Sequence, residues 1–391
     1  HHSIIRPLTV SKSHQHEFWL VHDQNRTWSE WSTMVVGGIV GWEEGQDDLF
    51  NPLSPRNRDD CLEPFRVLRA KAAERGIELH TLDVLEKTGI TPQFNLYIES
   101  LPLIPINNCK NYLIRFETDL TVPINGDADY LNQFDGIFTW DAVLLSKNSE
   151  NALNQKTAST PKFPLAYPNV LPAAFQLNQI VNPGFAGRDL FCVLIGSNRH
   201  ANLPDARELY SERVKAIRWF EANAPGDFAL FGNGWRVPQK RLGKSGKWRY
   251  RLEKVIPFLM GKAVFPSYRG AAKSKFAVLS KARFCICYEN ARDIPGYLTE
   301  KLFDALFAGC VPIYWGEPNI QEIVPSNCFI DFRQFVNGSN PYQDLYQYLS
   351  KMTEEDFIAY QEAGKQFLAS PAFRPFSSEA FAQAILGPIQ S

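Results

Sequence analysis

The 391-residue sequence lacks any long hydrophobic run. Its longest clean apolar stretch, about Met34 to Trp42, is far shorter than the ~18 residues that a membrane-spanning helix needs. It also has no Cys-x-x-Cys pair, and its seven cysteines are scattered along the chain. This pattern favours reduced, mostly buried thiols over disulfides or a zinc site. We therefore expect a soluble protein without a disulfide framework.

The chain also has no excess of charge of either sign. It contains 41 Lys and Arg against 42 Asp and Glu, so the formal net charge is −1. This balance gives no reason to expect nucleic acid as a partner. Because 45% of the residues are hydrophobic, the chain can bury a large core, which excludes a disordered protein. At about 150 residues per domain, the length predicts two or three domains.

Apolar runs alternate with amphipathic segments along most of the chain. Strands are predicted over residues 77–82, 94–98, 112–116, 134–138, 190–195, 228–231, 284–288 and 311–315. Helices are predicted over 61–75, 209–222, 271–281, 300–308 and 353–368. Alternating strands and helices are typical of doubly wound α/β domains, and several prolines between Thr157 and Pro183 favour a connector there. We expect an α/β fold with two Rossmann-like domains, residues 1–180 and 181–391, that face a cleft, and a helical C-terminal tail.

The most informative segment follows the strand over 284–288. Residues 288–290, Tyr-Glu-Asn, stand at its carboxyl end, where ligands bind in open α/β sheets. A loop then leads to Thr299, a good N-cap, and to a helix with Lys301 in its first turn. A lysine at that end of a helix is unfavourable unless an anion is nearby. Lys301 is therefore expected to have an anionic partner, either a bound anion or the carboxylate of Glu300 or Asp304.

The run from Cys287 to Gly316 resembles the signature of the family 10 glycosyltransferases, the α-1,3/4-fucosyltransferases. Their pattern is Phe-Glu-Asn, a short loop, Tyr-x-Thr-Glu-Lys, a helix, and a Val-Pro strand that ends in Gly. Here Tyr288 replaces the Phe, and the polar positions are kept. A weaker resemblance extends from about Asn111 to the C-terminus. The resemblance implies a GT-B fold whose second domain binds GDP-fucose.

The resemblance also implies a donor site. Its residues would be Ser197, Asn198, Arg213, Asn290, Tyr297, Glu300 and Lys301. Lys301 would contact the phosphates and Glu300 the ribose or sugar hydroxyls. Arg213 would hold the diphosphate in preference to Arg207 or Arg218, because it stands in the Arg-Val-Lys element that matches the family; its planar guanidinium suits phosphate. These charges would stabilise the leaving group without a metal, so GDP-fucose is expected as co-substrate and no cofactor is required.

Two short segments resemble ligand-binding motifs, but a structural role is expected for each. Gly232-Asn233-Gly234 lacks the third glycine of a dinucleotide fingerprint and predicts a loop. Asp127-Ala128-Asp129 imitates a metal motif but stands in a turn of the first domain, so a solvated turn is expected.

The general base of the family is a Glu in a Phe-Glu-Ser-Pro-like segment after a strand of the first domain. Two positions compete: Glu117 in residues 115–119 and Glu99 in residues 98–102. We choose Glu117 as the catalytic residue because residues 134–141 also resemble the family at a similar distance. Direct attack opposite the diphosphate would invert the anomeric centre.

The resulting prediction is an inverting fucosyltransferase that moves L-fucose from GDP-β-L-fucose to an oligosaccharide or glycolipid hydroxyl in α-1,3/4 linkage. The alternatives are a GT-B enzyme that uses another nucleotide-sugar, and an inactive glycan- or nucleotide-binding module. Without a membrane anchor, a cytoplasmic enzyme of bacterial type is expected; if an N-terminal anchor has been removed, the expectation is the Golgi lumen.

The balanced net charge conceals a basic segment. Residues 236–275 hold twelve Lys and Arg and one acid, Glu253, for a net charge of +11, whereas the rest of the chain, with 29 basic and 41 acidic residues, carries −12. One interpretation is a solvated loop. The other is a patch for the donor diphosphate or for an anionic membrane, with Trp248, Tyr250, Phe258 and Phe265 suited to membrane or glycan contact.

Overall fold

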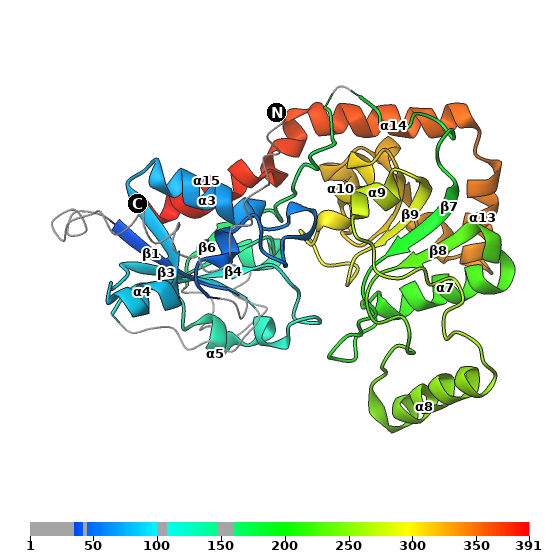
Figure 1. Cartoon of the computed structure of the whole chain (residues 1–391), viewed down its shortest axis with the longest axis horizontal. Helices are drawn as coiled ribbons and strands as arrows, with labels where there is room; N and C mark the ends of the chain where they lie inside the picture. Colours follow the sequence, from blue (N-terminus) through cyan, green and yellow to red (C-terminus); the bar gives the residue numbers. More distant parts are fainter. Residues whose placement is uncertain (1–34, 42–44, 100–107, 147–159, 178, 391) are drawn as a thin grey trace, which may run out of the picture.

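The computed structural model describes residues 35–41, 45–99, 108–146, 160–177 and 179–390. Two parallel β-sheets with helices packed on them form two lobes that lie side by side (Figure 1). We call the sheet nearer the N-terminus and its helices the first lobe, and the other the second lobe. The α/β class predicted from the alternation of strands and helices is confirmed, and each of the predicted strands is present.

The first lobe contains a six-stranded parallel sheet with the order β2-β1-β3-β4-β5-β6. Its strands are β1 (Val35–Val40), β2 (Ile77–Thr81), β3 (Phe94–Ile98), β4 (Lys110–Arg115), β5 (Gly136–Thr139) and β6 (Lys162–Pro164). Its helices are α3 (Glu63–Ala73), α4 (Leu82–Thr88), α5 (Ala128–Leu131) and α6 (Ala142–Leu145). Asp127 caps α5 by accepting the backbone N–H groups of Asp129 and Tyr130. The Asp-x-Asp look-alike is therefore a helix cap.

The second lobe contains a five-stranded parallel sheet with the order β11-β10-β9-β7-β8. Its strands are β7 (Leu190–Ile195), β8 (Phe228–Phe231), β9 (Ala282–Tyr288), β10 (Val311–Trp315) and β11 (Ile330–Asp331). Its helices are α7 (Tyr210–Asn223), α8 (Gly243–Leu259), α9 (Lys275–Leu279), α10 (Glu300–Phe307), α11 (Ile320–Ile323), α12 (Arg333–Val336) and α13 (Pro341–Lys351). The strand order reverses between β7 and β9, which is the switch point where such sheets bind ligands.

The end of the chain joins the two lobes. Helix α14 (Glu354–Ala369) begins with the capping box of Thr353 and Asp356 and runs along the second lobe (Figure 1). Helix α15 (Ser378–Gln390) returns to the first lobe. The ring centroids of Phe381 and Phe65 lie 5.7 Å apart, and both residues belong to the same buried core. The domain boundary at residue 180 stays a prediction. The last helix, although it follows the second lobe in sequence, packs in the core of the first lobe. Among the helices of the described residues, none combines the length and apolarity needed to span a bilayer.

Candidate functional site

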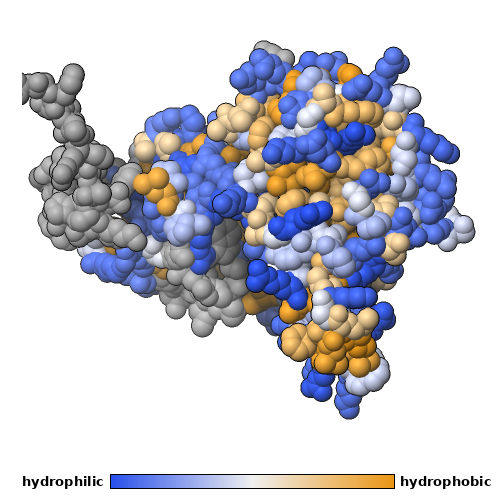
Figure 2. Space-filling view, turned by 45° about the vertical axis from the view of Figure 1, so that its right-hand side comes forward, coloured by the Kyte–Doolittle hydropathy of each residue, from blue (hydrophilic) through white to orange (hydrophobic). Residues whose placement is uncertain are grey.

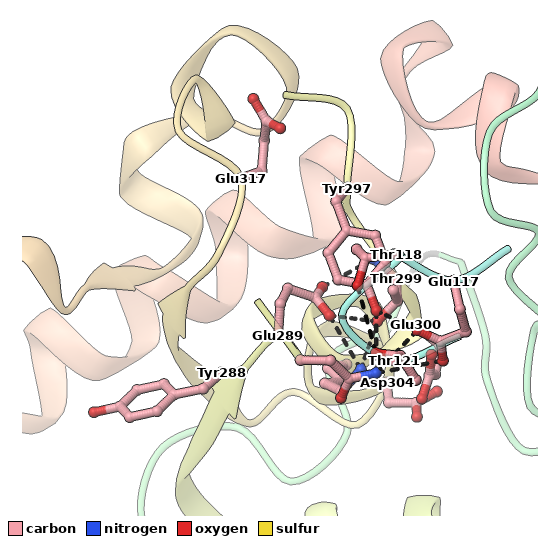
Figure 3. Close-up of polar contacts among 12 residues, drawn as sticks. Glu117, Thr118, Thr121, Tyr288, Glu289, Tyr297, Thr299, Glu300, Asp304 and Glu317 are labelled. Atoms are coloured by element: carbon pink, nitrogen blue, oxygen red, sulfur yellow. Dashed lines mark hydrogen bonds and ion pairs between the residues drawn. The ribbon is translucent and has the colours of Figure 1, made fainter. Parts of the chain in front are cut away.

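The carboxyl ends of β4 and β9 meet where the two lobes touch. Glu117 follows β4 in the first lobe, and Asn290 follows β9 in the second. The Asn290 Nδ2 donates to the Glu117 carboxylate, at 3.1 Å from Oε2 and 3.3 Å from Oε1. The Tyr297 hydroxyl donates to Glu117 Oε2 at 2.7 Å, and the two side chains point toward one another in Figure 3. Three residues predicted separately thus form one hydrogen-bonded group across the lobes.

The loop that carries Tyr297 is fitted closely to the first lobe. Gly296 adopts φ +90°, and a Cβ there would lie 2.1 Å from the Trp140 carbonyl oxygen. The Ala142 N–H donates to the Pro295 carbonyl at 3.2 Å, and the rings of Trp140 and Tyr297 have centroids 4.8 Å apart. Only glycine satisfies both this backbone conformation and this approach, so the loop position depends on Gly296.

Glu99 and Glu117, treated as competitors in the sequence, act together in the structure. The Glu99 carboxylate is 4% exposed and accepts the backbone N–H of Glu117 and the Nδ2 of Asn125. Asn125 also donates to the Glu117 carbonyl at 2.8 Å. Glu99 therefore holds the backbone at Glu117, while the Glu117 side chain turns to the second lobe. Burial, together with the nearby charge of Glu117, raises the pKa of Glu99 to about 8.

This raised pKa predicts a pH-dependent stability. Between the ordinary value of 4.5 and about 8, the folded state keeps a proton on Glu99 that the unfolded state has lost. The free energy of unfolding therefore contains a contribution from Glu99 that is present below pH 4.5 and falls as the pH rises through this window. We expect Glu99→Gln to remove that contribution. The free energy of unfolding of the variant should therefore increase relative to that of the wild type as the pH rises. Urea denaturation at several pH values measures it; parallel curves for the two proteins would contradict it.

Arg213 is a buried cation with neutral partners. Its side chain extends from α7, is 6% exposed, and donates through Nη2 to the Tyr288 carbonyl at 2.7 Å and to Asn290 Oδ1 at 2.9 Å. Within the described ranges, no carboxylate forms an ion pair with it. A buried guanidinium without a counter-charge is suited to an incoming anion.

The two alternative arginines are already neutralised. Arg207 forms an ion pair with Asp205 at 2.7 Å, and Arg218 forms one with Glu221 at 2.8 Å and also donates to the Val264 carbonyl. Only Arg213 among the three is bonded to Asn290. Of the three arginines, Arg213 is thus the one that joins the group around Glu117 and Asn290, and its contact with a diphosphate stays a prediction.

The anionic partner of Lys301 is Glu289, which the sequence analysis left without a role. The Lys301 Nζ lies 3.0 Å from Glu289 Oε2 and 2.8 Å from Thr299 Oγ1. Glu289 is fully buried and also accepts the N–H and hydroxyl of Thr299, at 2.8 and 2.7 Å (Figure 3). Burial lowers the pKa of Lys301, but the charges of Glu289 and Glu300 outweigh it, so the net shift is upward.

The alternative in which Lys301 forms an ion pair with Glu300 or Asp304 is not the one found, because its ion pair is with Glu289. Both carboxylates pair instead with Lys275, which lies 3.5 Å from Glu300 Oε1 and 2.7 Å from Asp304 Oδ2. Burial tends to raise the pKa of Glu300, but Lys301 and Lys275 lower it. Lys275 belongs to the basic segment in sequence, yet it serves as an internal counter-charge to α10.

Ser197 and Asn198 lie beyond the end of β7. The Asn198 side chain donates to the carbonyls of Gly234 and Val237, at 3.0 and 2.8 Å, and thereby fixes the predicted loop over residues 232–237. A Cβ on Gly232 would lie 1.9 Å from the Gly196 carbonyl oxygen, so this loop packs directly on the β7 end. Ser197, half-buried, stands beside this junction. Among the described residues, no group of three or more His, Cys, Asp or Glu is arranged to hold a metal ion.

Residues 247–365 match the family model described as glycosyltransferase family 10 (fucosyltransferase) C-term. Among curated relatives, the chain is 34% identical over 86 residues to the alpha-(1,3)-fucosyltransferase FucT of Helicobacter pylori, and 40% identical over 84 residues to an alpha-(1,4)-fucosyltransferase of Arabidopsis thaliana. Each match covers 22% of this chain, and they cover 18% and 20% of those relatives.

One solved structure, the sucrose-phosphate synthase of Thermosynechococcus elongatus, aligns with a TM-score of 0.51 and 10% identity over 91% of this chain and 98% of that one. Its likeness concerns the fold alone. The chain has the two-lobed GT-B fold, as the resemblance implied.

Proposed function

We propose that this chain, whose residues 247–365 match the family model of glycosyltransferase family 10, is an inverting fucosyltransferase. It would move L-fucose from GDP-β-L-fucose to a hydroxyl of an oligosaccharide or glycolipid. One observation carries the proposal: the hydrogen-bonded chain of Glu117, Asn290 and Arg213. It places a carboxylate of the first lobe beside a buried cation of the second, as base-assisted transfer from an anionic leaving group requires.

In the proposed reaction, Glu117 accepts the proton of the acceptor hydroxyl as its oxygen bonds to the anomeric carbon. The bond from that carbon to the diphosphate oxygen breaks, and GDP leaves with the electron pair. Because attack and departure occur on opposite faces, the β-linked donor gives an α-fucoside. Asn290 and Tyr297 orient the base through their hydrogen bonds to it, and Arg213 with Lys301 stabilises the charge on the diphosphate.

Lys301 has both a structural and a proposed binding role, and these can be separated. Lys301→Met leaves Glu289 charged and buried without its cation, which is expected to destabilise the fold by roughly 3–5 kcal/mol. Lys301→Met combined with Glu289→Gln removes both charges and should recover most of that loss. If Lys301 also contacts phosphate, the double variant stays impaired, with a KM for GDP-fucose raised roughly tenfold. Thermal unfolding and steady-state kinetics measure the two effects; a stable double variant with normal KM would limit Lys301 to its structural role.

The nucleotide preference separates the proposal from an enzyme that uses another donor. A ligand present at 100 times its Kd stabilises a folded protein by about 2.7 kcal/mol. We expect GDP to raise the melting temperature and UDP, at equal concentration, to leave it unchanged. Stabilisation by UDP alone would favour the other nucleotide-sugar.

A further inference from the structure

Helix α8 projects from the second lobe and stands apart from the rest of the molecule (Figure 1). Gly246 is its one buried residue. Large apolar side chains are left open to solvent: Trp248 is 66% exposed, Phe258 81% and Leu259 75%. Clustered apolar exposure of this kind marks an interaction surface. The interpretation of this part of the segment as a solvated loop is wrong.

The apolar residues of α8 form a continuous stripe. Trp248, Leu252, Val255 and Leu259 recur at intervals of four, three and four residues, which places them on one face of the helix. Phe258 and the exposed Met260 extend the stripe at the helix end. Figure 2 shows the projecting segment as a hydrophobic patch bordered by hydrophilic side chains. The helix is amphipathic, and within the part of the chain that the structure describes its apolar face is not packed in a core.

The polar face of α8 is strongly basic. The helix carries five cations, Lys244, Lys247, Arg249, Arg251 and Lys254, and a single acid. That acid, Glu253, is neutralised by Arg249 at 2.9 Å and by Arg241 at 3.1 Å. Basic side chains that flank an apolar stripe are the pattern of helices lying at the surface of anionic lipid.

Two of the residues proposed for this surface belong to the interior instead. Phe265 is 2% exposed, and the Arg218 guanidinium lies over it, 4.0 Å from the centroid of the Phe265 ring. Lys275 is the counter-charge to the acidic residues of α10. Phe265 and Lys275 are therefore left out of the proposed surface, and the exposed apolar side chains of the segment lie on α8 and at Leu242 and Met260 beside its two ends.

We propose that α8 binds the surface of an anionic membrane, with the Trp248–Leu259 stripe in the interface and the basic side chains at the lipid headgroups. Charge distinguishes this occupant from a second copy of the chain. A symmetric contact between two α8 helices would bring their cations together, which disfavours association. A negatively charged bilayer satisfies both the apolar stripe and the cations, and this role is independent of the proposed reaction.

The test is co-sedimentation of the full chain with vesicles of phosphatidylcholine, alone or mixed with phosphatidylserine. Binding is expected only to the mixed vesicles, and it should weaken as salt is added. A variant with Lys247, Arg251 and Lys254 changed to Gln should bind about 100-fold more weakly, because each cation near an anionic surface contributes roughly a fivefold gain. Phe258→Ser combined with Leu259→Ser should lower binding at least tenfold.

Matched variants control for general surface effects. Lys87, Lys281 and Lys351 changed to Gln remove three exposed cations elsewhere, and Leu53→Ser with Leu171→Ser removes two exposed apolar side chains; both should bind as the wild type does. The proposal would be overturned if the chain failed to bind the vesicles that contain phosphatidylserine. Equal binding to the two kinds of vesicle would also overturn it. So would an α8-dependent dimer in light scattering, which would assign the stripe to a second copy.

Discussion

Glu117→Gln is expected to reduce fucosyl transfer about 10³-fold, within the range attributed to a general base. The substitution keeps the size of the side chain and a carbonyl oxygen that can accept from Asn290 and Tyr297, but it removes the ability to take a proton. Nucleotide binding depends on other groups, so the stabilisation of the protein by GDP should remain near the wild-type value. Initial rates at saturating donor and thermal unfolding with GDP measure the two effects.

A matched control lies next to the base. Glu99→Gln changes a carboxyl group that holds the Glu117 backbone and contacts residues of the first lobe, and a partial loss of rate is expected. A Glu117→Gln protein with wild-type rate would remove Glu117 from the mechanism. A greater loss from Glu99→Gln than from Glu117→Gln would transfer the role of base to Glu99.

Arg213→Lys should abolish the stabilisation by GDP and lower kcat/KM for GDP-fucose roughly 100-fold. One guanidinium nitrogen, Nη2, donates to Tyr288 and Asn290, and the other N–H groups can donate to a diphosphate. A lysine ammonium cannot reproduce this planar arrangement of donors. The same change also loosens Asn290, which orients Glu117. Isothermal titration with GDP and steady-state kinetics with varied donor measure the losses.

Arg207→Lys is the control for this prediction. Arg207 stands three residues before α7 and is paired with Asp205, so its substitution should leave GDP binding unchanged. If both variants bind GDP as tightly as the wild type, the assignment of the diphosphate to Arg213 is contradicted.

Local patterns were sufficient to predict much of the fold. The continuous apolar run of β7 predicts a strand covered on both faces of a parallel sheet, and the run Met352-Thr353-Glu354-Glu355 predicts a capping box at the start of α14. These features depend on neighbours in sequence. Residues that directly follow a predicted strand could also be chosen as site candidates, because parallel strands bring their carboxyl ends to one edge of the sheet.

Partners that are distant in sequence could not be predicted. Nothing in the periodicity around Lys301 distinguishes Glu289 from Glu300 as its counter-charge, because the choice depends on how the loop between β9 and α10 folds back. Lys275 reaches α10 from another helix, and α15 packs on a core some 300 residues earlier in the chain. The one available signal for Glu289 was its position directly after a buried strand.

The most direct test of the central claim is to incubate the protein with GDP-fucose and a set of galactose- and N-acetylglucosamine-containing oligosaccharides. Mass spectrometry of the products, with proton NMR of the new anomeric centre, gives the result. The proposal predicts release of GDP and the addition of one deoxyhexose in α linkage, both lost in Glu117→Gln. A β-linked product, or transfer from a UDP-sugar in place of GDP-fucose, would contradict it.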